Sequence, residues 1–149
     1  MELLLWRHAK AEDGLPDHAR ELTRTGREQA RRVAAWLEEH GPREMRLLVS
    51  PATRTRQTAS CFREAMELND ALASAAAPKD ILAMIDWPNA QTPCLLVGHQ
   101  PMLGEIAAAL LPAASLPAFH KGALWWISGA AEEPARLRQI VEGARTARN

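Results

Sequence analysis

Three short apolar runs constrain the fold of this chain more than any other feature. They occupy residues 3–6, 47–49 and 95–97, and segments with helical periodicity separate them. Short apolar runs between helical patterns are typical of the buried strands of a parallel sheet. Polar residues follow each run directly, and open α/β sheets bind ligands beyond the carboxyl ends of their strands. We therefore expect a ligand site where these three segments end.

The polar residues at the predicted strand ends include two arginines and two histidines. Arg7 and His8 follow the first strand, Arg54 comes shortly after the second, and His99 follows the third. Each of them alone would be interpreted as a surface or loop side chain, because short motifs often arise by chance. Their convergence at one edge of a predicted sheet instead indicates a site for a small anion.

The complete pattern predicts a three-layer α/β/α sandwich with a mostly parallel sheet and one antiparallel edge strand. A chain of 149 residues is long enough to bury a core, so we expect a single domain over residues 1–149. The expected strands are residues 2–6, 46–49, 94–97, 123–128 and 136–141, the last of which is also compatible with a helix. The expected helices are residues 25–40, 51–67, 78–87 and 101–111, with residues 71–77 ambiguous and a loop between Pro112 and Pro117.

Two of these helices carry start signals in the sequence. Thr25 and Glu28 have the spacing of a capping box, in which each side chain satisfies an orphan backbone donor. Ser50 is the expected N-cap of the next helix, with Pro51 in its first turn. The first helix has an apolar face and ends before Gly41. That face consists of Ala30, Val33, Ala34 and Leu37.

Adjacent tryptophans occupy the predicted strand at residues 123–128. Successive side chains of a strand point to opposite faces, so Trp125 and Trp126 are expected on different sides of the sheet. The face that is not the main core must then be covered by a helix or by a partner.

Composition excludes several classes of protein. The net charge of +0 lacks the bulk basicity of a nucleic-acid binder. Cys61 and Cys94 show no disulfide or metal-ligand spacing, which favours reduced cysteines in a cytosolic protein. The apolar run near the amino terminus is too short for a signal peptide, and no stretch reaches transmembrane length. We therefore expect a cytoplasmic protein without nucleic-acid or membrane partners.

The residue types at the strand ends suit phosphoryl transfer. A neutral histidine has a lone pair that can attack phosphorus, and its ordinary pKa of about 6.5 populates that form near neutrality. Arginines disfavour the protonated ring and bind phosphoryl oxygens in fork geometry. We expect His8 to be phosphorylated transiently and then hydrolysed, with Arg7, Arg54 and His99 around the phosphate. Such a site requires neither a metal nor a cofactor.

The other histidines are weaker candidates. We expect His18 and His40 at the surface, whereas His120 and Lys121 precede a strand and can reach the rim of the site. The histidines do not have the spacing of a zinc site, so no metal is expected.

Three motifs resemble those of one known family. Arg7-His8-Ala9 resembles the RHG signature of the histidine phosphatase superfamily, which includes the cofactor-dependent phosphoglycerate mutases. Residues 50–58, SPATRTRQT, resemble its SPxxRxxQT segment, and residues 97–101, VGHQP, its second-histidine motif. The short length and the Gly-His-Gln-Pro turn are most similar to the phosphohistidine phosphatase (SixA) branch. This resemblance extends from residue 2 to about residue 128 and implies a phosphoglycerate mutase-like fold. It also implies that His8 is the nucleophile and that Arg7, Arg54 and His99 form the phosphate pocket.

The chain departs from the family pattern in two places. Ala9 replaces the glycine of the RHG signature, so a torsion open only to glycine is not required there. Members that cleave phosphomonoesters carry a general acid in the region of residues 68–80, where this chain offers only Asp70 and Asp80. Asp80 is better explained as a carboxylate in the first turn of a helix. An alkoxide leaving group needs a proton far more than an imidazole does.

The missing acid favours a phosphohistidine phosphatase that acts on a phosphorylated protein, such as a phosphotransfer domain. Two alternatives remain. The first is a small-molecule phosphomonoesterase, in which Asp70, Asp80, Glu12 or Asp13 serves as the acid. The second is a phosphate-binding module without catalysis, although binding alone would not require a histidine at position 8.

Overall fold

A single six-stranded sheet organises the computed structural model, which describes residues 1–112 and 116–144. The strand order is β3-β2-β4-β1-β5-β6. The first four strands in this order are parallel, β5 is antiparallel to β1, and the edge strand β6 is antiparallel to β5. The strands are β1 (Glu2–Arg7), β2 (Arg46–Val49), β3 (Glu67–Leu68), β4 (Cys94–Gly98), β5 (Leu124–Ala130) and β6 (Glu133–Val141).

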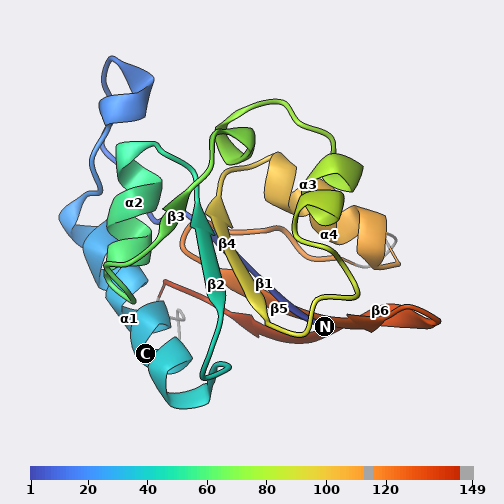
Figure 1. Ribbon diagram of the computed structural model, residues 1–149. Coiled ribbons are helices and arrows are strands. Elements are labelled where there is room, and N and C mark those ends of the chain that lie inside the picture. Colours follow the sequence, from blue (N-terminus) through green and yellow to red (C-terminus); the bar gives the residue numbers. More distant parts are fainter. Residues whose placement is uncertain (113–115, 145–149) are drawn as a thin grey trace.

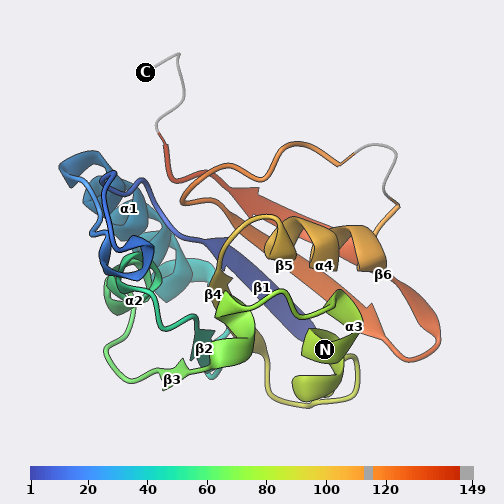
Figure 2. The ribbon, with the colours of Figure 1, turned by 90° about the horizontal axis from the view of Figure 1, so that it is seen from above.

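Helices cover both faces of this sheet. On one face lie α1 (Arg24–His40) and α2 (Thr53–Ser60), and on the other lie α3 (Pro78–Met84) and α4 (Met102–Leu110) (Figures 1 and 2). Two short 3₁₀ helices, η1 (Asp17–Ala19) and η2 (Asp70–Ala73), lie in the connections. The predicted three-layer sandwich with a mostly parallel sheet is therefore confirmed, and so is the choice of strand for residues 136–141. The strand that runs against the others is β5, which lies next to the edge strand β6 and not at the edge as expected. Among the described residues, no helix has the length and apolar character needed to cross a membrane.

The alternation of side chains along the central strands divides the core in two. Leu3 and Leu5 of β1 pack toward α3 and α4, whereas Leu4 and Trp6 pack toward α1. The four apolar α1 residues predicted to face the core are all buried in that second layer. Both layers are thus closed by helices, which leaves the strand ends as the place where polar side chains gather.

The tryptophan pair follows the same rule. Trp125 stacks on Phe119 in one layer, with ring centroids 4.5 Å apart. Trp126 lies in the other layer and meets Trp36 of α1 edge-on at 6.1 Å. The sequence left open whether a helix or a partner covers the face of the sheet that carries Trp126. The structure shows that helix α1 covers it.

The expected capping box at Thr25 is wrong. Thr23 is the N-cap, and its hydroxyl accepts a hydrogen bond from the backbone N–H of Gly26 at 2.9 Å. The backbone N–H of Thr23 in turn donates to the carbonyl of Lys10 at 3.0 Å. The start of α1 is thus set by a contact with a distant segment, which local spacing does not report.

The expected helix over residues 51–67 is also wrong in its bounds and its cap. Helix α2 covers Thr53–Ser60, and Ala52 stands at its N-cap position without a side-chain hydrogen bond. The Ser50 hydroxyl contacts the His99 ring instead. Glu67, the last residue of the predicted helix, belongs to β3 and pairs with Leu48 of β2. The chain near Glu67 is therefore part of the sheet and not helical.

The remaining expectations differ in detail. Helix α3 ends at Met84 rather than near residue 87, and α4 spans Met102–Leu110, close to its predicted bounds. The ambiguous segment at residues 71–77 contains most of η2. The predicted loop between Pro112 and Pro117 falls partly on residues 113–115, which lie outside the described residues. Cys61 and Cys94 are free, and Cys94 is buried at the start of β4 as expected.

Candidate active site

A cavity of about 800 Å³ opens at the carboxyl ends of β1 and β4, beside the start of α2. Arg7, His8, Arg54 and His99 all line it, so the structure brings together the four side chains that the sequence placed at strand ends. The rings of His8 and His99 are 5.4 Å apart between centroids. This is the convergence expected at the end of a parallel sheet.

His8 is fixed by its backbone and by its ring. Its N–H donates to the carbonyl of Gly98 at 3.0 Å, and its own carbonyl accepts from the N–H of Gly122 at 2.9 Å. Ring Nδ1 lies 2.8 Å from the carbonyl oxygen of Ala9. Because a carbonyl only accepts, Nδ1 must carry the hydrogen in this contact. The neutral ring then keeps the lone pair of Nε2 available.

The pKa of His8 is lowered to about 4. Burial is the largest cause, and the positive groups His99, Arg54 and Arg7 add to it, while the hydrogen bond to Ala9 acts in the opposite direction. His8 is therefore neutral near pH 7 in the free protein. A buried neutral imidazole with a free Nε2 is the state that a nucleophile requires.

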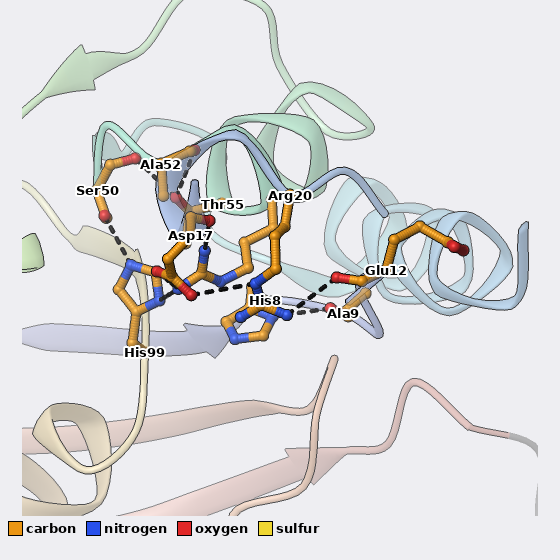
Figure 3. Close-up of polar contacts among 10 residues, drawn as sticks. His8, Ala9, Glu12, Asp17, Arg20, Ser50, Ala52, Thr55 and His99 are labelled. Carbon is orange, nitrogen blue, oxygen red and sulfur yellow. Dashed lines mark hydrogen bonds and ion pairs between the residues drawn. The ribbon is translucent and has the colours of Figure 1, made fainter. Parts of the chain in front are cut away.

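His99 makes two directional contacts. Its Nε2 lies 2.7 Å from the Ser50 hydroxyl (Figure 3), and its Nδ1 lies 3.3 Å from Nη2 of Arg54. A guanidinium only donates, so Nδ1 accepts and the hydrogen of the neutral ring resides on Nε2, directed at Ser50. Burial, followed by the charge of Arg54, lowers the pKa of His99 to about 4.

The two arginines retain donors without a partner among the described residues. The Nε atoms of both Arg7 and Arg54 are buried and make no hydrogen bond. Arg7 is held by its Nη1, which donates to the carbonyl of Phe119 at 2.7 Å. Buried donors normally find acceptors, and each one left unpaired costs about 1–3 kcal/mol. The residues themselves line the cavity, so their guanidinium groups are in place to face an oxyanion there.

Ala9 and the segment after it support this geometry. Its backbone N–H donates to the hydroxyl of Thr58 in α2 at 3.1 Å, and its side chain is fully buried. Asp86 is the only described residue other than glycine with a positive φ, so Ala9 adopts an ordinary backbone conformation. The expectation that position 9 does not require a torsion open only to glycine is therefore confirmed.

The sequence missed three titratable residues of the cavity wall. Asp17 begins η1, Arg20 follows it, and His18, expected only as a surface residue, lines the cavity between them. Arg54 donates to the backbone carbonyl of Asp17 at 2.9 Å and to its carboxylate at 3.1 Å. No periodicity or motif marks residues of a polar loop, so only the folded chain brings them to Arg54.

The four carboxylates considered as general acids lie elsewhere. Asp70 and Asp80 are exposed in the first turns of η2 and α3. Glu12 and Asp13 are exposed and line a separate, smaller hollow. None of the four lines the cavity that holds His8.

The other histidines also lie away from this cavity. His120 is exposed and pairs with Glu142 at 3.1 Å, and neither it nor Lys121 is among the lining residues. His40 is exposed at the end of α1, as expected, where it packs on Trp36. Within residues 1–112 and 116–144, no group of three or more His, Cys, Asp or Glu side chains is arranged to hold a metal ion.

Comparison with known proteins agrees with the motifs. The sequence model of the histidine phosphatase superfamily (branch 1) matches residues 3–74, which include Arg7, His8 and Arg54. The phosphohistidine phosphatase SixA of Escherichia coli is 28% identical over 133 residues, which cover 83% of each protein. An uncharacterised Picosynechococcus protein is 35% identical over 122 residues, covering 74% of this chain and 73% of that protein. The chain belongs to the histidine phosphatase superfamily.

Solved structures of the superfamily have the same fold. A structure from Nakamurella multipartitia that is assigned to SixA superposes with a TM-score of 0.80 at 27% identity, and 95% of each chain is covered. The resemblance to the histidine phosphatases seen in the three motifs is thereby confirmed, together with the phosphoglycerate mutase-like fold.

Proposed function

We propose that this histidine phosphatase removes phosphate from phosphohistidine in a protein, through a phosphorylated His8. The observation that carries the proposal is the orientation of the His8 ring. Its Nδ1–H donates to the Ala9 carbonyl, which leaves the lone pair on Nε2 free. His8 lines the same cavity as Arg7, Arg54 and His99, so this lone pair is available to a phosphoryl group bound there. A nucleophile and its anion-binding groups thus share one space.

The first chemical step is attack of His8 Nε2 on phosphorus. Arg7 and Arg54 line the cavity, bind the equatorial oxygens through their guanidinium groups and neutralise the charge that develops there. The negative phosphoryl group favours protonation of His99, because an opposite charge raises the pKa of an imidazole. Water then attacks the phosphoryl group on His8, releases phosphate and restores the neutral ring. No step in this sequence needs a metal or another cofactor.

The nature of the cavity wall favours a P–N bond over a phosphoester. The four candidate acids lie outside the cavity, and the pKa of Asp17 is lowered, chiefly by the charge of Arg54. An alkoxide would leave without a proton donor, which removes a contribution of about 10²–10⁴-fold to the rate. The imidazole of a protonated phosphohistidine leaves as a neutral ring and needs no donor. A phosphomonoesterase is therefore the less favoured function.

The size of the cavity suits a phosphorylated side chain on another protein. One wall consists mainly of small and apolar side chains, formed by residues 72–76 with Pro51, Pro101 and Met102. That wall can lie against the surface around a phosphohistidine, such as that of a phosphotransfer domain. The name of the Escherichia coli relative, phosphohistidine phosphatase SixA, supports the same substrate class.

The test is a comparison of two substrates and two variants. We expect a higher kcat/KM for a phosphohistidine protein than for an alkyl phosphomonoester such as phosphoserine, and no turnover of either by His8→Gln. His40→Gln removes an exposed histidine far from the cavity and serves as the matched control. Preference for the ester would indicate a phosphomonoesterase, and phosphate binding without turnover would indicate a binding module; either result refutes the proposal.

A further inference from the structure

Asp17 is the carboxylate that lines the candidate active site in the described part of the chain. Its two oxygens are held from opposite sides. Oδ2 accepts from Nη2 of Arg54 at 3.1 Å, and Oδ1 accepts from Nε of Arg20 at 3.1 Å. Arg20 is itself anchored by the backbone carbonyl of Glu12 at 3.1 Å. In Figure 3, Asp17 lies between the Ser50–His99 pair and Arg20.

This carboxylate acts as an acceptor and not as an acid. The charges of Arg54 and then Arg20 hold the pKa of Asp17 below its ordinary value. It is therefore ionised at neutral pH and has no proton to give to a leaving group. Its side chain nevertheless remains 67% exposed, so it is accessible to a substrate that enters the cavity.

A phosphohistidine brings a group that matches such an acceptor. When its ring is protonated, the nitrogen without phosphorus carries an N–H and the ring is a cation. Breaking the P–N bond then returns the electron pair to the other nitrogen and releases a neutral imidazole. When the ring is not protonated, the same cleavage must release an imidazolide anion, which is a far poorer leaving group. The reaction thus depends on keeping that N–H in place.

We propose that Asp17 is a specificity-determining residue that accepts a hydrogen bond from the free N–H of the substrate's phosphoimidazole ring. This rests on the proposed phosphohistidine phosphatase function. The carboxylate keeps the ring protonated while His8 Nε2 bonds to phosphorus and the P–N bond breaks. The N–H proton stays on the leaving imidazole, so the step needs no external acid.

The Asp17 carboxylate makes no favourable interaction with a phosphoester. An ester has no cationic N–H for it to bind, and its phosphate dianion meets a like charge at the cavity wall. Like charges in proximity disfavour binding, whereas a carboxylate and an imidazolium stabilise each other. Asp17 therefore raises the selectivity for P–N over P–O substrates.

The charged and titratable groups around Asp17 come from four segments. Arg54 belongs to α2, Arg7 ends β1 and His8 follows it, and His99 follows β4. His18 and Arg20 come just after Asp17 in the same segment. The pKa values of His8 and His99 in the free protein are about 4. Bound phosphate raises both, so an ester that brings phosphate without an imidazole is needed as a control for their titration.

The experiment compares the pH dependence of kcat for Asp17→Asn and the wild type. The probes are 1-phosphoimidazole, which has the ring of phosphohistidine, and p-nitrophenyl phosphate. The pH dependence of kcat reports groups in the enzyme–substrate complex. Removing the charge of Asp17 should lower the pH at which turnover of 1-phosphoimidazole falls by about one unit, which at pH 8 is a loss of roughly tenfold. At pH 6 the two proteins should differ far less.

The ester supplies the control. Asp17 also raises the pKa of His99, and a shift of the ester's profile measures that effect alone. This shift should be smaller than the one for 1-phosphoimidazole, because the ester has no ring nitrogen to protonate. Asp13→Asn, an exposed substitution in the same loop but outside the cavity, should give the wild-type profile with both substrates. An unchanged profile for 1-phosphoimidazole in Asp17→Asn, or an equal shift with the ester, would overturn the role of Asp17 alone. Wild-type protein that cleaves the ester but not 1-phosphoimidazole would overturn the proposed function as well.

Discussion

Burial of His8 makes the stability of this protein depend on pH in a way that can be calculated. The pKa of His8 is lowered to about 4 in the folded protein, mainly because the ring is buried, from an ordinary value of 6.5. Between pH 6.5 and pH 4, the His8 ring binds a proton in the unfolded chain but stays neutral in the folded chain. The free energy of unfolding therefore falls as the pH decreases from 6.5 toward 4, and this histidine contributes no change above that window.

The size of the effect follows from the same two values. At pH 5 the unfolded ring is protonated and the folded ring is almost entirely neutral. The difference from 6.5 to 5 is 1.5 pH units, which corresponds to about 2 kcal/mol at roughly 1.36 kcal/mol per unit. The ring is 8% exposed, so solvent screening reduces this figure little.

Urea denaturation at pH 7.5 and pH 5.0 measures the effect. The wild type should lose about 2 kcal/mol more on acidification than His8→Gln, which has no ring to protonate. His40→Gln, at an exposed position, should lose as much as the wild type. Equal losses in the wild type and His8→Gln would show that His8 titrates alike in both states, and the case for a neutral buried nucleophile would fail.

Three substitutions test other parts of the structure. Arg54→Lys keeps the charge but loses the planar fork, so kcat/KM should fall by about 10²–10³-fold in a steady-state assay. Gly26→Ala places a Cβ against the carbonyl of Lys10, and we expect a loss of roughly 2 kcal/mol or more in urea unfolding. Trp125→Ala removes a fully buried ring that stacks on Phe119, and we expect a loss of about 3–5 kcal/mol by the same method. A wild-type kcat/KM for Arg54→Lys, or a wild-type free energy of unfolding for Gly26→Ala or Trp125→Ala, would contradict the role given to that residue.

The sheet could be predicted from the sequence because its central strands are buried on both faces. The runs at residues 3–6, 47–49 and 95–97 are apolar throughout, and the structure places each of them within a strand. The caps could not be predicted in the same way. Thr23 is the N-cap of α1 because the chain there is hydrogen-bonded to Lys10, and Ser50 caps nothing because its hydroxyl contacts His99.

The residues of the candidate site also fall into a group that the sequence predicts and a group that it does not. His8 and His99 directly follow β1 and β4, and Arg54 lies in the first turn of α2, the helix after β2, so strand position alone brings them together. Asp17 and Arg20 reach the cavity from a polar loop whose path is fixed by hydrogen bonds to Arg54 and to the Glu12 carbonyl. Those contacts join residues far apart in sequence, and no local pattern encodes them.

Identification of the phosphorylated atom tests the central claim most directly. Wild-type protein mixed with a ³²P-labelled phosphohistidine protein and quenched in alkali should carry label on a histidine, and the label should be lost in acid. We expect peptide mapping to place it on His8, ³¹P NMR to place it on Nε2, and His8→Gln to carry none. Label on another residue, or phosphate release by the wild type without any phosphoenzyme in a rapid-quench experiment, would contradict nucleophilic attack by His8.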